Sequence, residues 1–178
     1  SDAHASWWFA SFHGVFVANW DTGINTSHED LTKNIKSEGY DFITDTKSSC
    51  DGNGFDAYPN DEGTSFHGSH VAGIIAAEAD NMRGIAGLAY NASIMPLRVL
   101  GIQDKGSSSD IAQAILYAAG LDNSSGKAPS QRSDISNMTF GSEAPDATKH
   151  DAIRQDTKTG PIFIATARII ARANSLLP

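Results

Sequence analysis

Two residues, Asp21 and His67, are of the types that transfer and stabilise protons in enzymes. Asp21 follows the apolar run 14–20, which predicts a buried strand. His67 begins the small, apolar segment 67–77, which predicts a buried helix. Ligands of open α/β sheets bind beyond the carboxyl ends of the strands. Because Asp21 follows a strand and His67 begins a helix, we expect both side chains at that edge.

Further apolar segments indicate the elements that must position this pair. Residues 39–43, 93–100, 135–140 and 160–166 predict strands. Helices are predicted from Ser108 or Ser109 as N-cap to Gly120 as the residue after the C-cap, and over residues 145–158. Strands that alternate with helices predict an α/β fold with a parallel sheet flanked by helices. Residues 44–66 show no period and predict a long loop.

Composition narrows the class of protein. The chain of 178 residues fits one domain, with 40% apolar residues and a net charge of −8. That charge argues against binding to nucleic acid or to anionic membranes, and no apolar run approaches the roughly 20 residues of a membrane span. Cys50 is the only cysteine, which excludes an internal disulfide. These features suit a soluble extracellular protein.

Five blocks of sequence carry a family resemblance. They are residues 21–23 (Asp-Thr-Gly), 67–73 (His-Gly-Ser-His-Val-Ala-Gly), 84–89, 97–100 and 137–141. In type and order they resemble the subtilisin-like (S8) serine proteases over about residues 14–167. The sequence therefore resembles the N-terminal part of such a catalytic domain, and a partial subtilisin-like fold is expected.

The resemblance implies roles for the active-site residues. It makes His67 the general base that takes a proton from a serine hydroxyl, and Asp21 the carboxylate that orients the imidazole. It implies a secreted endopeptidase with a protein or peptide substrate. That substrate would pair in extended form with two backbone stretches. The matching residues are Gly106, Ser107, Ser108, Thr139, Phe140 and Gly141.

Calcium is the cofactor that the resemblance implies, because Ca²⁺ binds six to eight oxygen ligands in flexible acidic loops. The matching ligands are Asp30, Glu78, Asn81, Arg83 and Ile85, some through their carbonyl groups. A second ion is a hypothesis for the acidic part of the long loop, where a plain acidic turn is the alternative. Its ligands would be Asp51, Asn53, Asp56 and Asp61.

Three features depart from the family. Asn19-Trp20 stands where two aliphatic residues are usual, and residues 167–169 (Ala-Arg-Ile) stand where an Ala-Gly-Asn supplies an oxyanion donor. No segment resembles the Gly-Thr-Ser-Met-Ala block of the nucleophile. We therefore expect an incomplete peptidase domain over residues 1–178, with a divergent tail at 168–178, that is inactive alone. Its apolar strand 161–167 is expected at an open sheet edge, which favours association.

Other interpretations fit less well. An aspartic protease needs a second Asp-Thr/Ser-Gly, which the sequence lacks, and a zinc protease needs His-Glu-x-x-His, whereas His67 and His70 are three apart. Two core histidines without chemistry remain an alternative. So does a non-catalytic subtilisin-like module that binds peptide or calcium.

Overall fold

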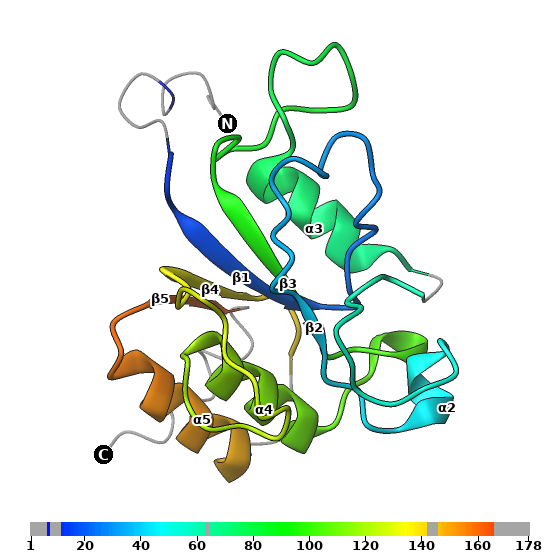
Figure 1. Ribbon diagram of the computed structural model, residues 1–178, viewed down its shortest axis with the longest axis vertical. Coiled ribbons are helices and arrows are strands. Elements are labelled where there is room, and N and C mark those ends of the chain that lie inside the picture. Colours follow the sequence, from blue (N-terminus) through cyan, green and yellow to red (C-terminus); the bar gives the residue numbers. More distant parts are fainter. Residues whose placement is uncertain (1–6, 8–11, 63–64, 142–145, 166–178) are drawn as a thin grey trace.

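The computed structural model describes residue 7 and residues 12–62, 65–141 and 146–165. One sheet has the order β2-β3-β1-β4-β5, all pairs parallel, with α3 over one face and α4 and α5 over the other (Figure 1). Within these ranges no helix is long and apolar enough to cross a membrane. The predicted α/β fold with a parallel sheet flanked by helices is confirmed. The elements are β1 (Phe16–Asp21), β2 (Tyr40–Asp41), α2 (Thr46–Ser49), α3 (His67–Ala76), β3 (Ser93–Arg98), a 3₁₀ turn (Ile102–Asp104), α4 (Ser108–Ala118), β4 (Ile135–Met138), α5 (Ala147–Thr157) and β5 (Ile162–Ala165).

The central strand β1 is buried over its whole length because both faces of the sheet are covered. Trp20 contributes to the core beneath α4, and its ring stacks on Phe163 at 5.7 Å between ring centroids. Val17 contributes to the core beneath α3. Asn19 Oδ1 accepts a hydrogen bond from Asn137 Nδ2 at 2.8 Å. The unusual Asn19-Trp20 pair therefore fits the sheet, although Asn19 Nδ2 and Trp20 Nε1 have no hydrogen-bond partner within the described residues.

Local chemistry moves some predicted boundaries. The N-cap of α4 is Ser107, not Ser108 or Ser109, because Ser107 Oγ accepts from the N–H of Asp110 at 3.0 Å. Gly120, with φ of 68°, ends this helix as predicted. The long loop also contains α2, whose four residues are too few to show a helical period.

At the sheet edge, β5 pairs only with β4 among the described strands. Its side chains alternate, so that Phe163 and Ala165 pack on the core while Ile162 and Ile164 are 64% and 50% exposed. An apolar edge strand is thus present over the described residues 162–165. Association through this edge stays a prediction.

Candidate active site

Asp21 is the last residue of β1, and it is 1% exposed. Its carbonyl oxygen accepts hydrogen bonds from the N–H groups of Val99 (2.9 Å) and Leu100 (3.1 Å). Its carboxylate accepts from the N–H of Thr22 at Oδ1 and from Thr139 Oγ1 at Oδ2, both at 2.8 Å. These neutral donors fix both the main chain and the side chain of Asp21.

His67 is the first residue of α3, and its ring faces Asp21. Nδ1 lies 2.7 Å from Oδ1 and 3.0 Å from Oδ2 of the carboxylate. Because an ionised carboxylate only accepts hydrogen bonds, Nδ1 carries the proton of the neutral imidazole, and Nε2 holds the free lone pair. The His67 side chain is 45% exposed. The pair therefore joins an accessible base to a buried carboxylate.

Gly68 allows α3 to begin directly against the turn that follows Asp21. A Cβ atom at this position would lie 2.0 Å from the carbonyl oxygen of Gly23. The Gly68 N–H donates to Thr22 Oγ1 at 3.0 Å, and the same hydroxyl donates to Asp61 Oδ2 at 2.7 Å. Thr22 thus connects the turn, the helix and the long loop. The sequence interpretation missed this role of Asp61, which it assigned to calcium.

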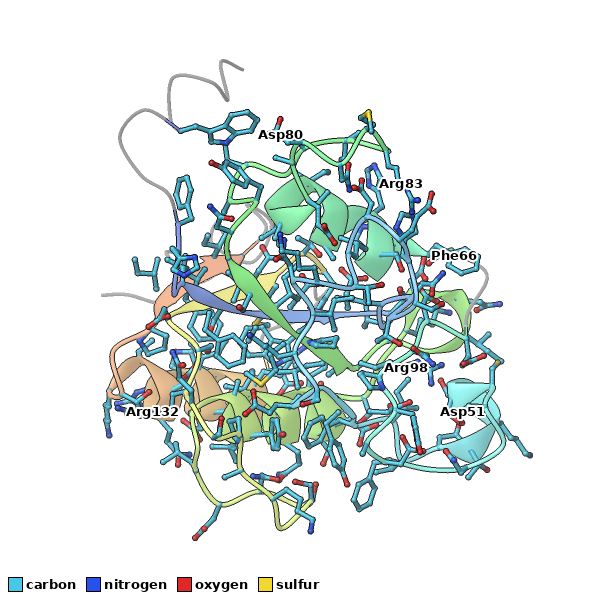
Figure 2. All side chains as sticks on the ribbon, turned by 45° about the horizontal axis from the view of Figure 1, so that its top comes forward. Asp51, Phe66, Asp80, Arg83, Arg98 and Arg132 are labelled. Carbon is cyan, nitrogen blue, oxygen red and sulfur yellow. The ribbon has the colours of Figure 1, made fainter. Side chains whose placement is uncertain are left out.

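Arg98, at the end of β3, is 1% exposed and bonds to three segments of the chain. Nη1 lies 2.5 Å from Asp41 Oδ2 and 2.9 Å from Asp51 Oδ2. Nη2 donates to the carbonyl oxygen of Ser49, and Nε donates to that of Thr22 at 3.2 Å. Figure 2 shows Arg98 beside the loop that carries Asp51.

The pKa of Asp41 is strongly shifted by its surroundings. Burial raises the pKa of its carboxyl group to about 7, although the N–H of Ile43 and the guanidinium of Arg98 act in the opposite direction. No motif in the sequence marks Asp41 or Arg98 as part of the site. The available signal was a lone arginine within the apolar segment 97–100.

The first predicted substrate stretch, Gly106 to Ser108, leads directly into α4. Ser107 caps α4 with its side chain, and its carbonyl accepts from the N–H of Ile111 at 3.1 Å. Ser108 is already helical. Helix α4 thus engages the Ser107 carbonyl, whereas the N–H of Ser108, in the first turn, has no intrahelical acceptor.

The second predicted stretch lies at the carboxyl end of β4, next to β1. Thr139 contacts Asp21 through its hydroxyl, so it also belongs to the catalytic edge. Phe140 is partly buried against the core, and Gly141 is exposed. The structure therefore places this stretch at the same strand ends as Asp21, and its role in substrate binding stays a prediction.

The residues predicted for the first calcium site gather around Asp30, which is 3% exposed. Its carboxylate accepts from Asn81 Nδ2 at 2.6 Å and from the N–H of Ile85 at 3.0 Å. No backbone donor among the described residues reaches the carbonyl oxygens of Glu78, Arg83 and Ile85. Both oxygens of the Asp30 carboxylate accept hydrogen bonds, so binding of a Ca²⁺ ion would require Asn81 to turn its amide and present Oδ1.

The residues predicted for the second ion do not gather at one point. Asp51 pairs with Arg98, and Asp61 accepts from Thr22. Asn53 donates to Asp56 Oδ2 at 2.9 Å within its own turn. The described part of the chain contains no group of three His, Cys, Asp or Glu side chains placed to hold a metal. The structure thus favours the acidic-turn alternative, because Arg98 already supplies positive charge there.

The remaining residues of interest lie outside the described ranges. These are the segment 167–169, where the family carries an oxyanion donor, and the divergent tail 168–178.

Comparison with known proteins decides the family. The subtilase family profile matches residues 13–173. The chain belongs to the subtilase family. It is 39% identical to an extracellular protease of Xanthomonas campestris over 95% of this chain and 31% of that protein. Its identity to subtilisin Savinase of Lederbergia lenta is 36%, over 86% of this chain and 47% of that protein.

A solved structure gives the same result for the fold of this subtilase chain. A protease from Pseudoalteromonas arctica superposes with a TM-score of 0.85 at 38% identity, covering 90% of this chain and 51% of that one. The subtilase chain thus spans between about a third and half of the length of these relatives.

Proposed function

We propose that this chain supplies the aspartate and histidine of the active site of a secreted serine endopeptidase, which hydrolyses peptide bonds in protein substrates. The contact of 2.7 Å between His67 Nδ1 and the buried Asp21 carboxylate carries the proposal. Membership of the subtilase family supports the chemistry, and the names of the extracellular relatives support secretion.

In this reaction His67 Nε2 takes the proton of a serine hydroxyl as the oxygen attacks the peptide carbonyl. Asp21 holds the imidazole in the required tautomer and stabilises its protonated form. Thr22 and Thr139 keep the carboxylate in place. His67 then returns the proton to the leaving amine. No segment of this chain resembles the family block that carries this serine.

A structural Ca²⁺ ion at the Asp30 loop is part of the proposal. Asp30, Asn81 and the carbonyl groups of Glu78, Arg83 and Ile85 would hold it. The Arg83 guanidinium does not oppose the ion, because it pairs with Glu29 at 2.6 Å. The ion would stabilise the loop that follows α3 and would take no part in the reaction.

The absence of a recognisable nucleophile block favours a second function for the chain by itself. In that case it is a subtilase module that binds peptide or calcium without cleaving a bond. Both functions use the same fold, so the decisive difference is whether His67 can activate a serine.

A hybrid enzyme separates the two. Residues 14–165 of this chain would replace the matching part of the Pseudoalteromonas arctica protease, which then supplies the serine and oxyanion donor. A fluorophosphonate probe should label the hybrid but not its His67→Ala variant, and should leave the 178-residue chain unlabelled. A hybrid that folds, by circular dichroism, yet stays unlabelled would refute the catalytic proposal. Labelling of the 178-residue chain would reveal a nucleophile within it.

A further inference from the structure

Three charged residues stand side by side at the carboxyl end of the sheet. In the strand register, Asp21 of β1 and Asp41 of β2 both pair with Arg98 of β3. Arg98 forms an ion pair with Asp41 but not with Asp21. Toward β1 it instead donates from Nε to the carbonyl oxygen of Thr22. The buried arginine in this row thus contacts the main chain of the catalytic turn.

The hydrogen bond from Arg98 to Thr22 adds to others that hold the turn after Asp21 in place. The peptide between Asp21 and Thr22 is held through the Asp21 carbonyl by two N–H groups that follow β3. The next peptide, between Thr22 and Gly23, is held by Arg98 through the Thr22 carbonyl. The N–H of Thr22 donates a hydrogen bond to the Asp21 carboxylate. The Thr22 hydroxyl accepts one from the N–H of Gly68, the residue after His67. A rotation of Thr22 would therefore disturb both members of the pair.

We infer that Arg98 is a positioning residue for the Asp21–His67 pair, and that it transmits the conformation of the loop around Asp51 to that pair. The inference rests on the proposed catalytic role of Asp21 and His67. The route runs from Asp51 and the Ser49 carbonyl, through the guanidinium, to Thr22.

Arginine suits this role because its rigid fork carries donors on three nitrogen atoms. Here Nε, Nη1 and Nη2 each reach a different segment: the catalytic turn, β2 with the loop, and the end of α2. A lysine ammonium has one nitrogen at the end of a flexible stem, so it cannot span the same acceptors. Arg98→Lys would thus keep the charge and lose the connection.

The chain offers matched variants for a test. Asp51→Asn removes one charged partner of Arg98 at the rim, where the Asp51 side chain is 15% exposed, so the fold should survive. Asp56→Asn removes the same charge from the same loop, but Asp56 accepts from Asn53 and Tyr58 and does not contact Arg98. Both variants remove one negative charge from this loop, so a difference between them at His67 reports the contact between Asp51 and Arg98.

The readout is the Nδ1–H proton of His67 in the ¹⁵N-histidine-labelled chain, observed by NMR. A short hydrogen bond to a carboxylate moves this resonance downfield and slows its exchange with water. Arg98→Lys and Asp51→Asn should shift the resonance upfield and accelerate exchange several-fold, whereas Asp56→Asn should leave both unchanged. Melting temperatures of all variants show how much each loses in stability.

The outcomes are distinct. If Asp51→Asn lowers the melting temperature but leaves the resonance at its original position and exchange rate, Arg98 has only a structural role and the inference is wrong. If the unmodified chain shows no downfield resonance at any pH, the Asp21–His67 pair itself does not form, and the proposed function fails first.

Discussion

Two buried aspartates occupy equivalent positions on either side of Arg98, and their surroundings differ sharply. Asp41 is fully buried and lies 2.5 Å from the guanidinium. Asp21 is equally buried, but the groups that contact its carboxylate are the N–H of Thr22, the hydroxyl of Thr139 and the ring of His67. The same residue type in the same layer of the sheet is thus paired with a permanent cation in one case and with a titratable base in the other.

The difference shows how the fold separates a structural charge from a functional one. A carboxylate paired with arginine stabilises little beyond the cost of its own burial, but it fixes the geometry of its neighbours. A carboxylate held by neutral donors keeps its attraction for an imidazolium. Asp41 therefore organises the loop, and Asp21 is left to interact with His67.

The contrast between the two aspartates should be greatest in enzyme activity, which depends on Asp21. Asp21→Asn in the hybrid enzyme should lower kcat by about 10⁴-fold, because an amide stabilises the wrong imidazole tautomer. Its melting temperature should change by only a few degrees. Kinetics on a chromogenic peptide measure the first quantity and thermal melting the second. A variant that keeps a tenth of the activity would mean that Asp21 does not orient His67.

Stability should depend on Asp41, the aspartate that pairs with Arg98. Asp41→Ala should lower the free energy of unfolding of the chain by about 3 kcal/mol, because Arg98 stays buried and loses the carboxylate closest to it. Urea denaturation measures this loss. Asp56→Ala serves as the control and should cost about 1 kcal/mol, because Asp56 is only partly buried and its carboxylate loses hydrogen bonds from Asn53 and Tyr58 but no ion pair. Equal losses in the two variants would contradict the distinction between a buried carboxylate that pairs with arginine and a partly buried one that does not.

A third buried aspartate, Asp30, tests the calcium proposal. Ca²⁺ at about 100 times its dissociation constant should raise the free energy of unfolding by about 2.7 kcal/mol, and Asp30→Asn should abolish the gain. Asp80→Asn, at an exposed position of the same loop, should retain most of it. Thermal melts with calcium and with a chelator measure the gain. Identical melting temperatures in both would refute the site.

The smallest effect concerns Asp156 of α5, which is fully buried and forms no ion pair within the described residues. Burial raises its pKa from 3.8 to about 6, although hydrogen bonds from Thr159 and Ser136 oppose the rise. The folded state therefore binds the proton more tightly than the unfolded state, so this group costs stability as the pH rises from about 4 to 6.

Asp156→Asn should thus be more stable than the unmodified chain by roughly 1–3 kcal/mol at pH 8 and equal to it near pH 4. Urea denaturation at both pH values measures the difference. Asp151→Asn, exposed on the same helix, should show no such dependence. A constant difference between pH 4 and pH 8 would contradict the assigned cause.

Much of the fold was predictable because it depends on local patterns. Buried parallel strands are continuous apolar runs, and the helix after Ser107 shows the apolar period. The four-residue helix α2 left no such pattern. The N-cap of α4 was misplaced by one residue because three consecutive serines have the same local chemistry.

The site was predictable only where a motif marks it. Asp21 and His67 lie in recognisable blocks, and the structure brings them into contact. The roles of Arg98, Asp41 and Asp61 depend on which loop crosses which strand end, so no spacing in the sequence shows them. The acidic segment around Asp51 was compatible with a metal site or a plain acidic turn, because its composition gives no indication of the arginine that it meets.

The proposed role of His67 as the general base can be measured in the hybrid enzyme. In the hybrid enzyme, kcat/KM for a chromogenic peptide should fall by about 10⁶-fold in His67→Ala, the size of the loss in kcat for the equivalent substitution in subtilisin, a member of this family. His70→Ala, three residues along the same helix, should change it less than about tenfold. A His67→Ala hybrid that remains folded and within tenfold of full activity would contradict the account.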